Sequence, residues 1–201
     1  MKMKQKTTDT LVIGGGIVGL MTAWYLMRDG VEVTLVEAAD DIGIQASGAN
    51  AGSLHLQIQY PEFVTYGEVW ARAYAPTLRF LNASIDLWKG LPCEFEEELD
   101  VALSGGLVVA MTDQQMRLIE AKARIEASVG VQTDILDSAD VHSMAPYLTD
   151  KVVGAGFCAR EGKANPLRVT PALMQATLSA GVEIWRQTRV TAIERRAGGF
   201  D

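Results

Sequence analysis

The stretch Thr10–Glu37, TLVIGGGIVGLMTAWYLMRDGVEVTLVE, decides the fold of this chain. It opens with a run of β-branched and apolar residues, Thr10–Ile13, which predicts a buried strand. Apolar side chains then recur at helical spacing over Ile17–Arg28, and Gly30 is placed to end that helix as a left-handed cap. The alternation over Val31–Val36 predicts a second strand. Strand, turn, helix and strand form a βαβ unit, in which the two strands are parallel and the crossover is right-handed.

The turn GGGIVG places Gly14, Gly16 and Gly19 in the pattern of the dinucleotide-binding fingerprint. The first of these glycines permits the tight turn, the second lets a pyrophosphate approach the backbone, and the third lets the helix pack closely on the sheet. Free N–H groups and the dipole at the start of the helix favour phosphate there. Glu37 ends the second strand, where a carboxylate can accept both ribose hydroxyl protons, which favours FAD or NAD over NADP.

The next stretch, Asp40–Gln57, reads DDIGIQASGANAGSLHLQ and is a loop of small residues with many short donors, which suits a large planar ligand. Together with GGGIVG and Glu37, this loop resembles the FAD-dependent oxidoreductases of the D-amino-acid oxidase superfamily. Members include glycine oxidase, sarcosine oxidase, D-amino-acid dehydrogenases and the FAD-carrying subunits of opine oxidases. The string ANAGSLH is most similar to the opine oxidase and hydroxyproline dehydrogenase type. The resemblance implies FAD as the cofactor, where the βαβ unit alone leaves NAD open.

The resemblance also implies which residues contact the cofactor. Ser47 would lie on the ribose and pyrophosphate side, the loop after Asn50 would follow the ribityl chain, and His55 would lie near the flavin. The alternative for His55 is a histidine packed on a strand. The backbone of Val190 would hold the adenine, unless Val190 is a plain core residue. The candidate cofactor-binding residues are Gly14, Gly15, Gly16, Ile17, Val18, Gly19, Glu37, Ala38, Ser47, Asn50, Ala51, Gly52, Ser53, Leu54, His55 and Val190.

The rest of the chain predicts a mixture of helices and strands. A helical run over Gln59–Lys89, divided at Pro76, precedes a hairpin of two strands, Glu94–Leu103 and Leu107–Met111, around Ser104–Gly106. Helical spacing and caps predict three further helices, over Asp113–Val129, Asp137–Met144 and Leu167–Ala180. Strands are predicted over Val152–Ala159, Val182–Trp185 and Arg189–Glu194.

The expected fold class is α/β, with a Rossmann-like FAD-binding domain and an inserted α+β lobe of the substrate-binding domain. Residues 1–90 are assigned to the first part of the FAD-binding domain, 91–160 to the start of the substrate-binding domain, and 161–201 to a return to the FAD-binding domain. The final residues, Ala197–Asp201, have the pattern of a hairpin turn whose returning strand is missing, so we expect an N-terminal portion that is incomplete at its C-terminus.

Composition restricts the class of partner. The chain has 201 residues, 48 % of them hydrophobic, which is enough for a packed core, and a formal charge of −7, which disfavours nucleic acid. Its two cysteines do not have the spacing of a metal or redox site, so we expect no metal site. We expect a cytoplasmic location, and the alternative is a peripheral position at the inner face of the membrane. The apolar stretch Leu11–Met27 is too short and too rich in glycine for an integral membrane segment.

The resemblance implies an enzyme that oxidises the carbon–nitrogen bond of an amino acid or secondary amine. A hydride passes from Cα to flavin N5, and the imine is then hydrolysed. No catalytic acid or base is assigned, and the electrons go to oxygen or to a partner electron-transfer subunit. The alternatives are an NAD-dependent dehydrogenase with the same fingerprint, and a non-catalytic fragment or subunit.

Overall fold

The computed structural model describes residues 6–201, and packing divides them into two compact units built from interleaved segments. The first unit comprises residues 6–51, Cys93–Leu99 and Asn165–Asp201, and the second comprises Gly52–Pro92 and Asp100–Ala164. The three consecutive parts expected from the sequence were defined by the ligand that each would contact, and that assignment stays a prediction.

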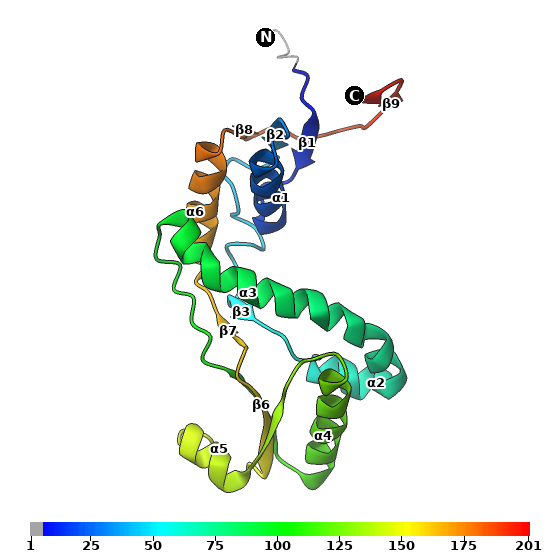
Figure 1. Ribbon diagram of the computed structural model, residues 1–201, viewed down its shortest axis with the longest axis vertical. Helices are drawn as coiled ribbons and strands as arrows, with labels where there is room; N and C mark the ends of the chain where they lie inside the picture. The colour runs from blue at the N-terminus through cyan, green and yellow to red at the C-terminus, as the bar shows by residue number, and fades with distance from the viewer. Residues whose placement is uncertain (1–5) are drawn as a thin grey trace. The chain divides into compact units, whose positions relative to one another are not determined.

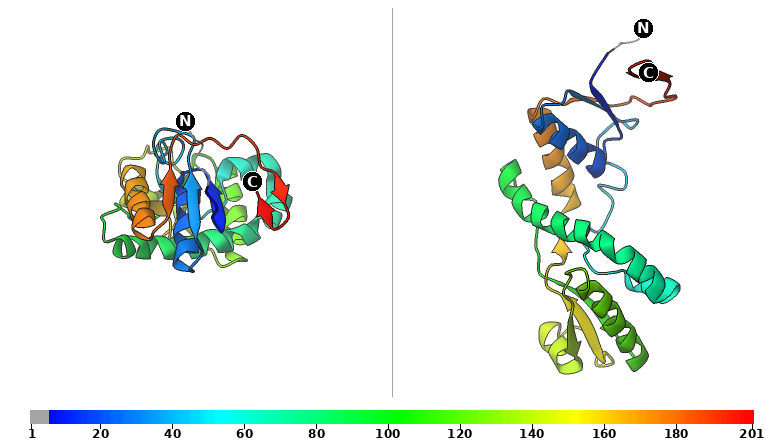
Figure 2. Two further views of the ribbon diagram at one scale, coloured as in Figure 1. Left: turned by 90° about the horizontal axis from the view of Figure 1, so that it is seen from above. Right: turned by 45° about the vertical axis from the view of Figure 1, so that its right-hand side comes forward.

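The first unit contains the predicted βαβ unit. Strands β1 (Thr10–Ile13) and β2 (Val33–Val36) pair in parallel, and helix α1 (Ile17–Arg28) joins them. A third parallel strand, β8 (Glu183–Trp185), follows helix α6 (Pro166–Ser179) and pairs with β2. Figure 2 shows the three strands side by side in the order β1-β2-β8. All four residues of β2 are buried, as expected for the central strand of a parallel sheet.

The core of the first unit lies between α1, the sheet and α6. Leu20 and Ala23 of α1 are fully buried and share this core with Leu35 of β2 and Leu173 of α6. Burial of a leucine side chain contributes roughly 1.5–3 kcal/mol, so these contacts and not helix propensity fix the place of α1. Gly30 has a φ of +83°, which confirms the predicted left-handed cap.

The second unit contains an antiparallel sheet. Its strands β4 (Gly106–Ala110), β5 (Asp134–Asp137) and β6 (Gly154–Cys158) lie in the order β4-β6-β5. Figure 1 shows helix α4 (Asp113–Ala127) on one side of these strands and α5 (Ser138–Met144) on the other. Strands β4 and β6 and helices α4 and α5 confirm predicted elements to within a few residues, whereas β5 was not predicted. The two units together confirm the predicted fold class.

The long helical run of the second unit is divided as predicted. Helix α2 (Tyr60–Tyr74) is followed by a 3₁₀ turn over Ala75–Thr77, which contains Pro76, and then by α3 (Leu78–Phe95). Gly67 adds a second break, because its φ of +75° is outside the helical region.

The second unit also contains a separate pair of short strands. Strands β3 (Ser53–Leu54) and β7 (Gly162–Lys163) pair antiparallel.

The predicted hairpin over Glu94–Leu103 and Leu107–Met111 is wrong. Helix α3 continues through Pro92 to Phe95, and the segment after it makes one isolated bridge, between Ala102 and Lys163. Strand β4 exists, but its partner is β6, more than forty residues further along the chain. The hairpin signal at Ser104–Gly106 suggested a first strand where a helix end and a loop are found.

The predicted strand over Arg189–Glu194 is also wrong, because residues 188–194 are irregular. A short hairpin follows, in which β9 (Arg195–Arg196) pairs with β10 (Gly199–Phe200). The glycine turn therefore does have a returning strand. Within the described part of the chain, none of the helices combines the length and the apolar character that crossing a membrane requires.

Candidate functional site

The turn between β1 and α1 shows why glycine is needed at two of its positions. Gly14 has a φ of +104°, a conformation that other residues rarely adopt, and its N–H donates to the carbonyl of Val36 at 2.8 Å. A Cβ on Gly19 would lie 1.9 Å from the carbonyl oxygen of Gly14. Helix α1 therefore packs against its own entry turn at a distance that only glycine allows, as the fingerprint predicts.

The start of α1 is open to an anion. Gly16 is the N-cap and has no side chain to cap the helix, and the first turn, Ile17–Leu20, carries no acidic residue. Ser47, from the small-residue loop, compensates in part, because its Oγ accepts a hydrogen bond from the Ile17 N–H at 2.9 Å. The helix dipole and the remaining amide donors favour a negatively charged group at this position.

Glu37 lies directly beside this turn, at the end of β2. Its Oε2 accepts from the Gly15 N–H and its Oε1 from the Ala39 N–H, each at 2.7 Å. The hydrogen bonds from Ala39 and Gly15 lower the pKa of the Glu37 carboxyl, and the charge of Arg189 lowers it further. The side chain is therefore a carboxylate at neutral pH. A carboxylate has about four lone-pair sites, so these two bonds leave acceptor capacity for a ligand.

A hollow in the first unit joins the turn, Glu37 and the loop. Its lining residues are Gly16, Glu37, Asp41, Gly43, Ile44, Gln45 and Ser47. Three of these were predicted, and the stretch from Asp41 to Gln45 was missed. Asp41 accepts from the N–H of Ile42 at 2.8 Å and from Arg186 at 3.1 Å, and these contacts lower the pKa of its carboxyl. A pair of acids directly after the βαβ unit is the sequence signal that could have identified this side of the hollow.

The remaining predicted residues of the first unit have varied surroundings. Asn50 donates from Nδ2 to the carbonyls of Ala46 and Ser47, so its side chain stabilises the fold of the loop itself. Ile17 is half-buried, whereas Val18, Ala38 and Ala51 are exposed.

Val190 lies in the irregular segment after β8 and is half-buried. Just before it, Thr188 donates its N–H to the carbonyl of Glu37 and Gln187 donates to that of Ala39, each at 2.8 Å. The chain leading to Val190 is therefore held beside the end of β2 by backbone hydrogen bonds, without forming the predicted strand.

Four predicted residues belong to the second unit. Ser53 and Leu54 form β3, Gly52 precedes it, and His55 follows it with an exposed imidazole. Their contact with a cofactor stays a prediction.

A family model described as FAD dependent oxidoreductase, named DAO, matches residues 9–201. The chain belongs to this family. The cofactor implied by the resemblance, FAD, is thereby confirmed at the level of the family, and the NAD alternative loses its support.

Individual relatives agree with this assignment. One of the opine oxidase subunits of Rhizobium meliloti is 27 % identical over 202 residues, which are 96 % of this chain and 51 % of that protein. Glycine oxidase from Geobacillus kaustophilus matches the structure with a TM-score of 0.81 at 22 % identity, over 96 % of this chain and 50 % of that one. L-α-glycerophosphate oxidase from Mycoplasma pneumoniae, solved with FAD bound, matches with a TM-score of 0.79 at 21 % identity, over 98 % and 49 %. The chain spans about half the length of the curated relatives it matches.

The site in this DAO family chain fits the adenosine diphosphate portion of FAD. The open start of α1 suits the pyrophosphate, and the free acceptor capacity of Glu37 suits ribose hydroxyls. A side chain at Gly16 would crowd this place, since even a Cβ would lie 3.0 Å from Ser47 Oγ. The contacts of individual residues with the cofactor stay predictions.

Proposed function

We propose that this chain binds FAD through the β1–α1 turn and serves an oxidoreductase that oxidises the carbon–nitrogen bond of an amino acid or a secondary amine. The observation that carries the proposal is the open N-terminus of α1 with the carboxylate of Glu37 beside it, in a chain of the DAO family. The amine substrates are favoured by the names of two relatives, one an opine oxidase and the other a glycine oxidase.

The chain's own residues bind and orient the cofactor. The amide groups at the start of α1 that Ser47 does not use would donate to the pyrophosphate, next to the Ser47 hydroxyl that accepts from Ile17. The Glu37 carboxylate accepts from the ribose hydroxyls, and the loop from Asn50 to His55 continues the site toward the flavin. When bound, FAD supplies the hydride acceptor, at N5, for the substrate Cα–H, and the imine product hydrolyses in water.

A second candidate reaction is the oxidation of glycerol 3-phosphate at a carbon that bears a hydroxyl group. Relatives named glycerol 3-phosphate dehydrogenase and glycerol 3-phosphate oxidase, each 26 % identical to this chain, favour it. Both reactions remove a hydride from carbon, so the cofactor site is the same and the substrate distinguishes them.

A partner chain is part of the proposal, because the relative from Rhizobium meliloti is named as one subunit of an oxidase. A cytoplasmic location is also part of it. Cys93 and Cys158 are both free thiols, and a reducing compartment suits free thiols.

The test is a flavin titration followed by a substrate panel. The purified chain is mixed with FAD, and binding is read from the change in the flavin absorption band and fluorescence. The control is Gly16→Val, whose side chain crowds Ser47 and the start of α1 and is expected to abolish binding. Turnover with an artificial electron acceptor is then measured with amino acids, secondary amines and glycerol 3-phosphate. FAD binding that is equal in the wild type and in Gly16→Val would refute the proposed site.

A further inference from the structure

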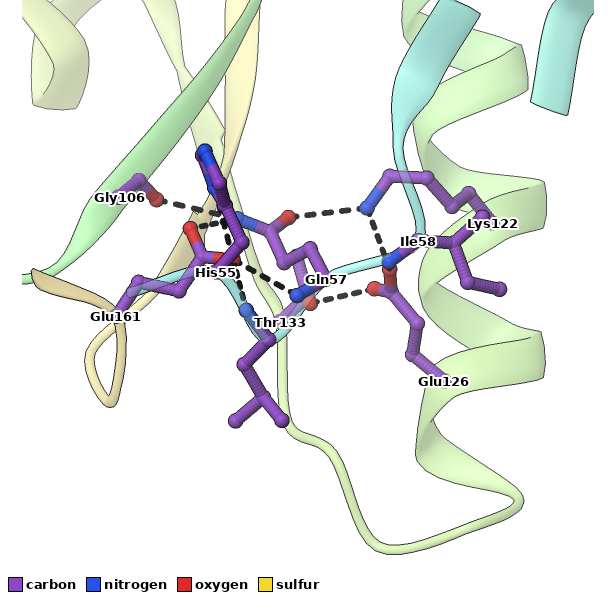
Figure 3. A network of polar contacts seen from close by, with 9 residues as sticks. His55, Gln57, Ile58, Gly106, Lys122, Glu126, Thr133 and Glu161 are labelled. Atoms are coloured by element: carbon purple, nitrogen blue, oxygen red, sulfur yellow. Dashed lines mark hydrogen bonds and ion pairs between the residues drawn. The ribbon is translucent and has the colours of Figure 1, made fainter. Parts of the chain in front are cut away.

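A chain of buried polar side chains crosses the second unit (Figure 3). Lys122 and Glu126 are completely inaccessible to solvent, and Gln57 and Glu161 are 4 % and 5 % exposed. Charged side chains are almost never fully buried unless they are paired. The arrangement therefore needs a structural explanation, and each of its contacts supplies part of one.

The pair Lys122 and Glu126 lies on α4, one helical turn apart. Lys122 Nζ donates to Glu126 Oε1 at 2.6 Å and to Gln57 Oε1 at 3.0 Å. The same Glu126 Oε1 accepts the Ile58 N–H at 2.7 Å, and its Oε2 accepts the Thr133 hydroxyl at 2.6 Å. Both oxygens of this carboxylate are used, and one of them binds the backbone of a distant segment.

Gln57 links this pair to a second carboxylate, and its side chain has one satisfactory orientation. Since its Oε1 accepts from Lys122, its Nε2 points the other way, toward Glu161 Oε2 at 3.1 Å and the Gly106 carbonyl at 3.3 Å. Turning the amide over would place an N–H₂ against the ammonium of Lys122, and two donors cannot bond to each other.

Glu161 binds the backbone where β3 has ended. It lies in the connection between β6 and β7, and its Oε1 accepts the N–H groups of both Leu56 and Gln57 at 2.7 Å. With the Glu126 contact to Ile58, two buried carboxylates satisfy three successive amides of an irregular segment. Buried amides that lack a strand partner need such acceptors.

His55 lies between two fixed points of the chain. On one side, Ser53 and Leu54 pair with β7, and on the other side the Glu161 carboxylate holds the next two amides. The His55 Nδ1 lies 3.9 Å from Glu161 Oε1, and its side chain is 56 % exposed while that of Glu161 is 7 % exposed. The buried carboxylate thus sets the backbone from which an accessible imidazole projects.

We infer that Glu161 is a positioning residue for His55, one of the residues proposed to contact the cofactor. It acts through the backbone of Leu56 and Gln57, and the polarised chain through Gln57 to Lys122 fixes the orientation of its carboxylate. This inference rests on the proposed function, in which His55 lies near the flavin.

The test compares Glu161→Gln with Glu62→Gln, an exposed glutamate of α2, in the purified chain without FAD. The new amide nitrogen has the size of the lost oxygen but faces Gln57 Nε2, donor against donor. Hydrogen exchange at the amides of Leu56 and Gln57 is expected to rise by about tenfold or more in Glu161→Gln, as for loss of a charge-assisted hydrogen bond, and not in the control. Exchange at wild-type rates would overturn the inference.

The NMR resonance of the His55 imidazole supplies a second readout, which general destabilisation of the fold would not give. The chain has two histidines, and His142 lies in α5, so it serves as an internal reference. We expect the His55 resonance to move in Glu161→Gln while that of His142 does not. If the variant does not fold, the wild type still decides: exchange of the Leu56 and Gln57 amides at the rate of an unstructured peptide would contradict the carboxylate contacts.

A final measurement separates this inference from the proposed function. If the wild type binds no FAD, the proposed function fails and the role of Glu161 toward the flavin fails with it, whatever the amides show. If FAD binds, the visible circular dichroism of the flavin is expected to differ between the wild type and Glu161→Gln. An identical flavin spectrum, together with faster amide exchange, would leave FAD binding standing and overturn the positioning role.

Discussion

Glu37 and Glu161 each accept hydrogen bonds from two backbone amides, but burial gives them different uses. Glu161 is buried, and its oxygens are occupied by Leu56, Gln57 and the Gln57 side chain. Glu37 is half-buried, and its oxygens accept from the amides of Gly15 and Ala39. A carboxylate in the first state can only hold structure, whereas one in the second state can also bind a ligand. The sequence identified Glu37 because it follows a strand at a fixed distance from a glycine turn.

At the residue scale, Glu37→Gln is expected to weaken FAD binding by about tenfold or more, because one charge-assisted hydrogen bond to a ribose hydroxyl is worth roughly 1.5–3 kcal/mol. The measurement is a fluorescence titration with FAD. Asp40→Asn is the matched control, since it removes the same charge from an exposed position three residues further on. Equal dissociation constants for Glu37→Gln and the wild type would remove Glu37 from the site.

The same residue predicts a pH dependence of stability. The amides of Ala39 and Gly15 lower the pKa of Glu37 in the folded state. The ionised Glu37 side chain therefore makes its full contribution to stability at pH values above its pKa in the unfolded chain, about 4.3. This contribution is lost as the pH falls through the lower pKa of the folded state. Urea unfolding of the wild type and of Glu37→Gln should give free energies that differ at pH 7 and converge in acid. A difference that stays constant over this range would contradict the role of these hydrogen bonds.

At the element scale, local signals predicted the elements whose ends and neighbours are local. Helix α1 has the predicted bounds, because a glycine turn precedes it and Gly30 ends it. The pairing of β4 with β6 was not predictable in this way, since the partner lies more than forty residues further along the chain. Long-range pairing depends on which faces meet, and a window of ten residues does not contain that information.

The buried face of α4 is an intermediate case. Ile119, Lys122, Ala123 and Glu126 are all buried and follow helical spacing, so a charged pair on the apolar face was visible in the sequence. Gln57 and Glu161, which complete its contacts, come from segments with no periodic relation to α4. The buried pair Lys122 and Glu126 could therefore be predicted, but its contacts with Gln57 and, through Gln57, with Glu161 could not.

The cap of α4 gives an element-scale prediction. Thr112 Oγ1 accepts the Gln115 N–H at 3.2 Å, and Gln115 Oε1 accepts the Met111 N–H at 2.7 Å, which is close to a capping box. Thr112→Ala is expected to lower the free energy of unfolding by about 1 kcal/mol, and Thr112→Ser to retain most of it. Denaturant unfolding measures both, and an equal loss in the two variants would show that the hydroxyl is not the stabilising group.

The packing of α1 against its entry turn gives a second prediction at this scale. In Gly19→Ala the new Cβ would lie 1.9 Å from the Gly14 carbonyl, so the helix must move, at a cost of about 1–3 kcal/mol. Gly199→Ala is the control, since a Cβ there meets nothing within 4 Å. We expect lower stability and weaker FAD binding in Gly19→Ala alone, measured by thermal unfolding and titration. Wild-type behaviour of Gly19→Ala would refute the close approach.

At the scale of the whole molecule, the order of segments along the chain differs from their grouping in space. Cys93–Leu99 and Asn165–Asp201 pack with the βαβ unit, while Gly52–Pro92 packs with the antiparallel sheet. The helical pattern over α2 and α3 predicted helices correctly but did not indicate which core they join. The site inside the first unit could be predicted because its turn, acid and loop lie within residues 6–51, where sequence distance and spatial distance agree.

The proposed site in the first unit can be tested with fragments of the cofactor. The turn and Glu37 would bind the adenosine diphosphate part of FAD, which ADP carries and FMN lacks. A ligand at a hundred times its dissociation constant adds about 2.7 kcal/mol of stability, or roughly 5–10 °C in Tm for a chain of this size. In thermal unfolding we expect FAD and ADP to raise the Tm, FMN to have a smaller effect, and Gly16→Val to respond to none of them. Stabilisation by FMN but not by ADP would show that the first turn of α1 is not where the cofactor is held.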